Sequence, residues 1–263
     1  MTAAFPDTLQ NRLLASLPDS DYEALRPTLE AVNLPHRRVL YEANKPIRFV
    51  YFFETGVGSL VSTMRNGSAS EVGTIGNEGF VGLPVLFGDQ KAPTNVYVQV
   101  PGAGLRMTAD AFREAVAKTP SLRVALLHYA HSFFNQVAQS AACATFHTLE
   151  QRCCRWLLMT RDRMDTDDFM LTQEFLAMML GVRRAGVTIA AGKLQRDELI
   201  HYKRGHLTIR DSAALKKRSC ECYDVTKTDF DRLLGTLEEH RRLHPPARQK
   251  YAASESRSIP AHK

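Results

Sequence analysis

Short runs of β-branched and aromatic residues, separated by turn residues, dominate the chain between residues 32 and 108. Such residues favour strands because they fit a pleated, half-buried surface. Asn66-Gly67 separates two of the runs, and Asn-Gly is a strong signal for a tight hairpin turn. Many short strands with frequent turns predict an antiparallel β-sandwich or barrel rather than a parallel sheet. The predicted strands are FVYFF (49–53), GSLVSTM (58–64), SEVGTI (70–75), NVYVQV (95–100) and GLRM (104–107).

A long helix is predicted after Pro120, from Ser121 to about Thr145. Its apolar positions form two adjacent stripes, so both faces have to be buried. One stripe can cover the β-domain, and the other can pair with the same helix of a second chain. We expect the dimer interface at Leu122, Leu126, Tyr129, Phe133, Gln136 and Ser140, while the second stripe holds Leu127, Ala130, Phe134, Val137, Ala141 and Ala144. A buried core helix in a monomer is the alternative.

Residues 173–192, QEFLAMMLGVRRAGVTIAAG, predict a helix-turn-helix. Thr172 is a suitable N-cap for the first helix. Gly181 stands where the chain has to turn, because a positive φ is cheap only for glycine. The inner face of the pair is expected at Leu176, Ala177, Leu180, Val182 and Val187. The second helix of such a unit enters the major groove of DNA.

The residues left on the outer face are candidates for contact with DNA. An arginine at position 183 or 184 can grip a guanine edge or a phosphate, and Ile189 can meet a thymine methyl. Residues 199–209, LIHYKRGHLTI, then predict a hairpin with a basic tip, a wing that would contact adjacent phosphates. The expected DNA-binding residues are Thr172, Gln173, Arg183, Arg184, Thr188, Ile189, Lys193, Lys203, Arg204 and His206. The alternative is a helical pair that packs internally.

The charge distribution agrees with a polyanion partner for the second half of the chain. The net charge of the 263 residues is +6. Residues 1–148 carry 12 basic and 12 acidic residues, whereas residues 172–218 carry 10 basic and 4 acidic ones. A locally basic region favours nucleic acid, although a solvated basic surface would look the same.

The composition is that of a globular protein, with 44% hydrophobic and 24% charged residues. We find no apolar run of transmembrane length and no secretory signal, so we expect a cytoplasmic protein without a membrane partner. No nucleophile elbow, P-loop, HExxH motif or carboxylate pair indicates an enzyme. The fold class expected is α+β, with a sensor domain at 1–120, a dimerisation helix at 121–147, a winged helix-turn-helix domain at 148–240 and a disordered tail at 241–263.

This order of elements resembles the Crp/Fnr family of bacterial transcription regulators over roughly residues 9–235. The resemblance is carried by GNEGFVGLPVLFG (76–88), the long helix, CCRWLLMTRDR (153–163) and LTQEFLAMMLGVRRAGVT (171–188). It implies a cyclic-nucleotide-binding-like jelly roll, a dimerisation helix and a winged helix domain. Arg184 matches the family's first base-reading arginine, but Ala185 and Ile189 replace a glutamate and a second arginine. The resemblance therefore implies a homodimer on a palindromic operator that differs from the family's usual half-site. Double-stranded DNA and a second copy of the chain are the expected partners, and RNA polymerase stays open as a third.

The sensor departs from the nucleotide-binding members of the family. Gly82 fits the glycine of the phosphate cassette, but Leu83 stands where a ribose-binding glutamate would be, and residues 84–100 contain no arginine. Burying a cyclic phosphate without a charge partner is expensive. Cyclic AMP binding is therefore not expected; the alternative is a regulator gated by a cyclic nucleotide or another ligand, whose chemistry stays unknown. The candidate effector residues are Gly82, Leu83, Thr94, Asn95 and Tyr129.

The five cysteines are an odd number, which favours reduced thiols over a disulfide framework. No cysteine precedes Cys143, so the family's N-terminal iron–sulfur motif is absent. We expect Cys143, Cys153 and Cys154 to pack within helices, and His147 to be a helix-end residue. A redox or metal pair at Cys220 and Cys222 stays open, but neither a cofactor nor a metal is expected.

Overall fold

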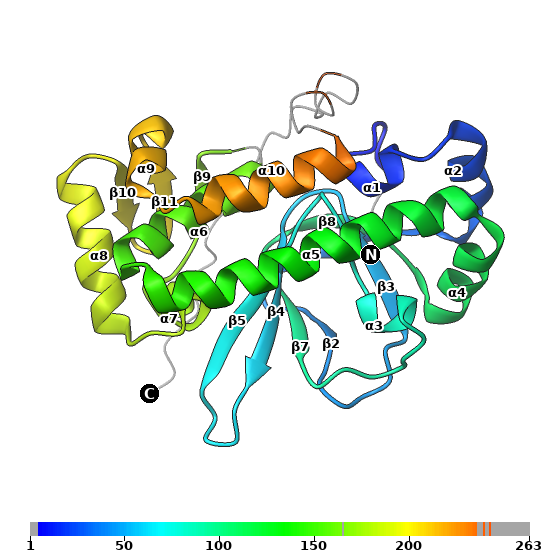
Figure 1. Ribbon diagram of the computed structural model, residues 1–263, viewed down its shortest axis with the longest axis horizontal. Coiled ribbons are helices and arrows are strands. Elements are labelled where there is room, and N and C mark those ends of the chain that lie inside the picture. Colours follow the sequence, from blue (N-terminus) through cyan, green and yellow to red (C-terminus); the bar gives the residue numbers. More distant parts are fainter. Residues whose placement is uncertain (1–4, 165, 236–238, 240–241, 243–263) are drawn as a thin grey trace, which may run out of the picture.

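A computed structural model describes residues 5–164 and 166–235 and positions 239 and 242. Two lobes share the long helix α5 (Pro120–Phe146) as a common support (Figure 1). The β-domain covers the N-terminal part of α5, and the remaining lobe gathers at its C-terminal end. The tail expected at 241–263 lies outside the described residues, except for position 242.

The β-domain consists of two antiparallel four-stranded sheets, ordered β1-β8-β3-β6 and β2-β7-β4-β5. All five predicted strands are present, and three short ones are additional. The sheets do not close into a barrel, so jelly roll is the accurate description. The strands are β1 (Glu30–Leu34), β2 (Val39–Tyr41), β3 (Phe49–Phe53), β4 (Val57–Thr63), β5 (Ala69–Ile75), β6 (Phe80–Val81), β7 (Asn95–Val100) and β8 (Gly102–Thr108).

The hairpin between β4 and β5 turns where Asn-Gly predicts it. Gly67 has a φ of +83°, and the Asn66 side chain accepts a hydrogen bond from the Ser68 amide at 3.0 Å. Small helices surround the sheets: α1 (Arg12–Ala15), α2 (Asp19–Leu25), the 3₁₀ turn η1 (Arg26–Thr28), α3 (Leu83–Leu86) and α4 (Ala109–Lys118).

The long helix α5 buries the stripe that we expected at a dimer interface. Leu122, Leu126 and Tyr129 are fully buried in the core of the β-domain, together with Phe133 and Gln136. The interface prediction is wrong for these five residues, because their own subunit already encloses them. Ser140 is half-buried and accepts a hydrogen bond from Arg155.

The neighbouring stripe of α5 is the one that stays partly uncovered. Leu127 is 49% exposed and Phe134 is 69% exposed. Ala130 of the same predicted stripe is buried and Val137 packs against the core, so only part of that stripe is uncovered. The aromatic ring of Tyr129 fills space beside Phe80, Phe133 and Phe230, which places this side chain in the core of its own subunit.

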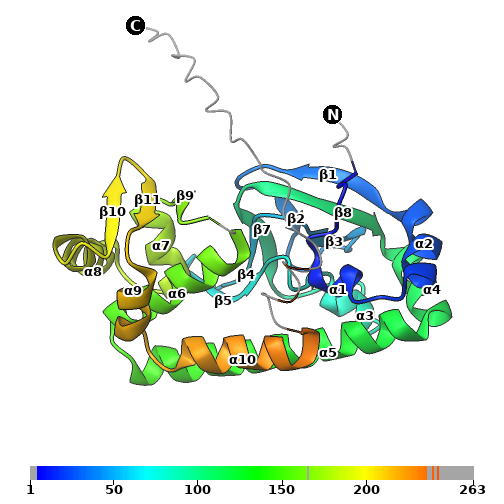
Figure 2. The same ribbon diagram turned by 90° about the horizontal axis from the view of Figure 1, so that it is seen from above.

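The second lobe follows α5 without a long linker. It contains α6 (Leu149–Met164), α7 (Gln173–Leu180), α8 (Arg184–Arg196), α9 (Ser212–Arg218) and a three-stranded sheet ordered β10-β11-β9. Its strands are β9 (Asp168–Met170), β10 (Ile200–Lys203) and β11 (His206–Ile209). The last helix, α10 (Cys222–Leu234), returns along α5, as Figures 1 and 2 show.

The two lobes pack directly against each other. A single hydrophobic cluster contains Val57, Val61 and Val100 of the β-domain together with Trp156 and Leu176 of the second lobe. Polar contacts reinforce this junction, because Arg163 of α6 pairs with Glu78 at 2.7 Å and donates to Gln136 of α5 at 3.0 Å. The position of the second lobe is therefore coupled to the sheet and to the long helix.

Candidate nucleic-acid interface

The helices α7 and α8 form a sharp corner. The Thr172 hydroxyl caps α7 by accepting a hydrogen bond from the Phe175 amide at 3.2 Å. Gly181 ends α7 in the left-handed conformation, with φ +63°. The direction of α8 differs from that of α7 by 109°, which lies in the range of helix-turn-helix units.

The inner face of this corner agrees with the pattern in the sequence. Leu176, Ala177 and Leu180 of α7 are buried, and so is Val187 of α8, while Val182 is half-buried. The Val182 amide donates to the Ala177 carbonyl at 3.0 Å, and this hydrogen bond spans the turn between α7 and α8. Apolar packing thus fixes one face of α8 and turns the other outward.

The outward face carries the two arginines. Arg183 is the N-cap residue of α8 and Arg184 is its first helical residue, and both are exposed. Neither forms an ion pair with any residue that the structure describes. Their guanidinium groups are therefore available to a phosphate or to a base edge.

Other predicted residues of α7 and α8 share this surface but are partly engaged. Ile189 is 72% exposed. The Thr188 hydroxyl donates to the half-buried Gln173 side chain at 2.7 Å. Lys193 pairs with Glu150 at 2.7 Å, so its charge is already partly compensated within the subunit. Lys193 is accordingly a weaker candidate for contact with DNA than Arg183 or Arg184.

The wing has the basic tip that the sequence predicts. Lys203 of β10 faces His206 of β11 in the antiparallel register. Arg204 and Gly205 form the two-residue turn with φ values of +51° and +81°, the conformation of a type I′ turn. Lys203, Arg204 and His206 are exposed. The wing is anchored because the Tyr202 hydroxyl donates to the Leu171 carbonyl at 2.5 Å.

A separate pocket lies in the β-domain beside α3. Three of the candidate effector residues, Gly82, Leu83 and Thr94, line it. The other lining residues are Tyr41, Leu60, Ile75, Phe80, Val81, Pro84, Phe87, Ala92, Pro93 and Phe133. None of these side chains is charged, so the pocket offers no cation for a cyclic phosphate.

Two of the effector candidates do not line this pocket. The Asn95 side chain accepts a hydrogen bond from the Ala43 amide at 3.0 Å, and it serves to fix the β-domain backbone. Tyr129 is fully buried in the aromatic core. The expectation for these two residues is therefore corrected, because local packing and backbone satisfaction occupy their side chains.

Comparison with known proteins identifies the class. Residues 31–119 match the family described as cyclic nucleotide-binding domain, and residues 151–218 match the family described as Crp-like helix-turn-helix domain. The protein is a DNA-binding transcription regulator. Within that class, it belongs to the Crp/Fnr family. Among curated proteins, none matches the sequence.

Solved structures share the fold at low sequence identity. A putative Crp/Fnr regulator from Eubacterium rectale has a TM-score of 0.61 and 15% identity, over 78% of this chain and 96% of that one. FixK2 from Bradyrhizobium japonicum has a TM-score of 0.63 and 12% identity, over 73% and 98%. The c-di-GMP responsive regulator CLP from Xanthomonas campestris has a TM-score of 0.61 and 15% identity, over 74% and 100%.

Membrane-spanning segments were sought in the described residues. No single helix there is both long and apolar enough to cross a bilayer. Taken together, α7 and α8 are long and apolar enough to span a bilayer, by length and composition alone. They are, however, the two helices of the 109° corner described above.

Proposed function

We propose that this chain acts as a homodimer that binds a palindromic operator through α8 and the wing. The observation that carries the proposal is the pair Arg183 and Arg184, exposed and without ion pairs in the described residues, at the start of a helix that the 109° corner holds outward. Residues at the N-terminus of a recognition helix reach the base edges. Lys203 and Arg204 of the wing then meet the adjacent phosphates.

An uncovered stripe of α5, which shares Leu127, Phe134 and Ala141 with the predicted second stripe, supports the dimer. Val124, Leu127, His131, Phe134, Ala138 and Ala141 are all exposed on one helix face. Their spacings alternate between three and four residues, which is the repeat of a coiled-coil seam. Pairing this seam with a second copy buries apolar side chains that are otherwise in water and creates two-fold symmetry. A two-fold axis also matches the symmetry of a palindrome, whose half-sites lie about 34 Å apart.

We further propose that the β-domain does not bind cyclic AMP. The apolar pocket supports this part of the proposal. Its lining lacks a charged side chain, and the exposed Lys91 is not part of it. Isothermal titration calorimetry with cyclic AMP and cyclic GMP tests this part. We expect no heat of binding; tight binding of either nucleotide would contradict it.

The central experiment selects binding sites from a random DNA library with the full-length protein. We expect an enriched palindrome, and we expect the double variant Arg183→Ala with Arg184→Ala to lose the enrichment. Arg26→Ala is the matched control, because this exposed arginine lies on η1 in the β-domain. Equal binding to every sequence, or unchanged selection by the double variant, would contradict the proposal.

A further inference from the structure

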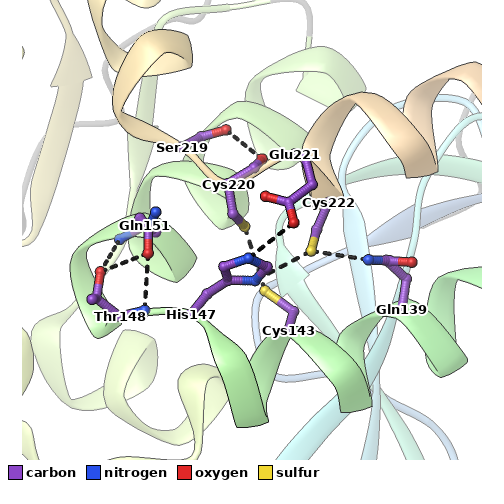
Figure 3. Close-up of polar contacts among 9 residues, drawn as sticks. All are labelled: Gln139, Cys143, His147, Thr148, Gln151, Ser219, Cys220, Glu221 and Cys222. Carbon is purple, nitrogen blue, oxygen red and sulfur yellow. Dashed lines mark hydrogen bonds and ion pairs between the residues drawn. The ribbon is translucent and has the colours of Figure 1, made fainter.

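Four side chains with metal-ligating atoms converge where α5 ends and α10 begins (Figure 3). Cys143 lies in the last turn of α5, and His147 is its C-cap residue. Cys220 follows α9, and Cys222 is the first residue of α10. One ligand atom from each of the four lies within 4.8 Å of all the others. Residues separated by more than 70 positions in sequence thus form one cluster.

Two of the separations within the cluster are close to those expected around one tetrahedral ion. Cys143 Sγ is 3.5 Å from Cys220 Sγ, and Cys222 Sγ is 3.4 Å from His147 Nδ1. With zinc–sulfur bonds of about 2.3 Å and zinc–nitrogen bonds of about 2.0 Å, a tetrahedron has edges of about 3.8 Å between sulfurs and about 3.6 Å between sulfur and nitrogen. The observed separations are therefore close to those edges.

The local sequence explains why the four atoms meet. Cys143 and His147 are four residues apart, so they project from the same side of the helix end. Thr148 then starts α6, since its hydroxyl and the Gln151 side chain cap the helix in both directions, at 3.4 Å and 3.0 Å. This capping holds His147 in an extended backbone conformation between two helices. The three cysteines are buried in a cluster of their own, and the His147 side chain is half-buried.

Neighbouring residues orient the ligands as they do around protein-bound metals. Glu221 Oε1 lies 3.1 Å from His147 Nε2. With the proton on Nε2, the histidine donates to this carboxylate and leaves Nδ1 free to face Cys222. Gln139 Nε2 donates to Cys222 Sγ at 3.0 Å. Two cationic side chains, Arg152 and Arg155, interact electrostatically with Cys143 at the edge of the cluster.

Other chemistries explain less of this arrangement. A disulfide between Cys143 and Cys220 would use two of the four groups and leave the pairing of His147 with Glu221 unexplained. An iron–sulfur cluster places several iron and sulfide atoms between its cysteines, so its ligands have to stand further apart than these. Three thiolates and one imidazole at tetrahedral separations suit zinc, for which Cys₃His is a common structural set.

We propose that Cys143, His147, Cys220 and Cys222 bind one zinc ion, which ties the C-terminal end of α5 to the start of α10. This replaces our sequence-based expectations of simple packing for Cys143, a helix-end role for His147 and no metal. Since α10 packs along α5, the ion would hold the DNA-binding lobe in a fixed position relative to the long helix. The site stands on its own ligands and does not depend on the proposed dimer or operator.

Metal content of the full-length protein tests the proposal. After equilibrium dialysis of reduced protein against zinc, we expect one zinc per chain, measured by plasma mass spectrometry. Cobalt in place of zinc should give tetrahedral ligand-field bands and thiolate charge-transfer absorption. Cys220→Ser should lose the zinc. The matched control Cys154→Ala should keep it, because this buried cysteine belongs to the hydrophobic cluster that contains Trp156 and not to the cysteine cluster.

A second variant keeps the test sharp even if Cys220→Ser fails to fold. Glu221→Ala removes only an exposed side chain, so the fold should persist, as checked by circular dichroism. Loss of such an orienting carboxylate should weaken zinc affinity by about 10- to 100-fold. Wild-type protein without bound zinc, or equal zinc in wild type and Cys220→Ser, would overturn the proposal. A Cys143–Cys220 disulfide in place of metal would overturn it as well.

Discussion

Trp156 donates its indole N–H to the Glu71 carboxylate at 3.0 Å, and this bond joins α6 of the DNA-binding lobe to β5 of the jelly roll. The Ser59 hydroxyl donates to the same carboxylate at 2.5 Å. Burial raises the pKa of Glu71 to about 7, although both hydrogen bonds and the nearby Arg163 act in the opposite direction. The contact between the lobes therefore contains a carboxyl group that resists ionisation.

This pKa gives the stability a pH dependence with a definite sign. A carboxyl group whose pKa is raised in the folded state binds its proton more tightly there than in the unfolded chain. Its contribution is fully present below about pH 4.5 and is lost as the pH rises through about 7. We expect Glu71→Gln to raise the melting temperature at pH 8 and to change it little at pH 4.5.

Thermal unfolding of both proteins across this pH range checks the prediction. Glu54 also has a pKa raised to about 7 by burial, so part of the pH trend should survive in Glu71→Gln. Glu54→Gln is the matched variant, because the hydrogen bonds that Glu54 accepts within the described residues come from the amides of Gln10 and Asn11 beside the jelly roll. If the melting temperatures of wild type and Glu71→Gln change in parallel with pH, ionisation of Glu71 does not destabilise the folded protein.

Substitutions in α8 and in the wing should have different effects on DNA binding. Arg184→Ala removes a candidate base contact, which should cost about 1–3 kcal/mol of discrimination and relax the preference at one base pair. Lys203→Ala removes a phosphate contact, so it should weaken binding to all sequences alike and reduce the salt slope of the affinity by about 1. Fluorescence anisotropy at several salt concentrations, with the selected operator and point-mutated operators, separates the two effects. If both variants keep the salt slope and the sequence specificity of the wild type, neither residue contacts DNA.

Much of this architecture could be predicted from local sequence. The strands of the jelly roll, the turn at Gly67, the cap at Thr172 and the bend at Gly181 each depend on a few neighbouring residues, and all are confirmed. The assignment of the α5 stripes could not be made this way. Both stripes are apolar, and only the shape of the surrounding core decides which one is enclosed.

The cysteine cluster shows a second limit of local patterns. Cys143 and His147 are four residues apart, and Cys220 and Cys222 are two apart, but neither pair alone has the C-x₂-C or H-x₃₋₅-H spacing that identifies the common zinc motifs in a sequence. Their meeting depends on the return of α10 along α5, which is a tertiary contact. The signal that could have pointed to it is the presence of two incomplete pairs in one chain.

The proposed dimer predicts a clear effect of charge on the uncovered stripe. Phe134→Glu should yield a folded monomer, since Phe134 is 69% exposed in the subunit and a glutamate there disrupts only the seam. Val39→Glu is the matched control, because Val39 is 52% exposed but lies on β2 of the jelly roll. Size-exclusion chromatography with light scattering should report twice the subunit mass for wild type and control. A dimeric Phe134→Glu variant would place the interface elsewhere.

The last prediction concerns the buried ion pair between the lobes. Arg163 and Glu78 are 7% and 6% exposed. Arg163 donates to Glu78 at 2.9 Å, to Gln136 at 3.0 Å and to the Met159 carbonyl at 2.9 Å, so its guanidinium is well satisfied. Glu78→Leu would leave this cation buried without its partner, which typically costs about 3–5 kcal/mol.

Replacing both charged residues should cost less than replacing either one. The double variant Glu78→Leu with Arg163→Met removes both charges and keeps apolar volume at the junction, and such replacements of buried ion pairs are often close to neutral. Urea unfolding of the wild type, both single variants and the double variant gives the coupling free energy directly. We expect a large favourable coupling between the two residues. Additive single effects would mean that the two residues do not couple, and that the other contacts of the junction, among them the apolar cluster around Trp156, hold the lobes together.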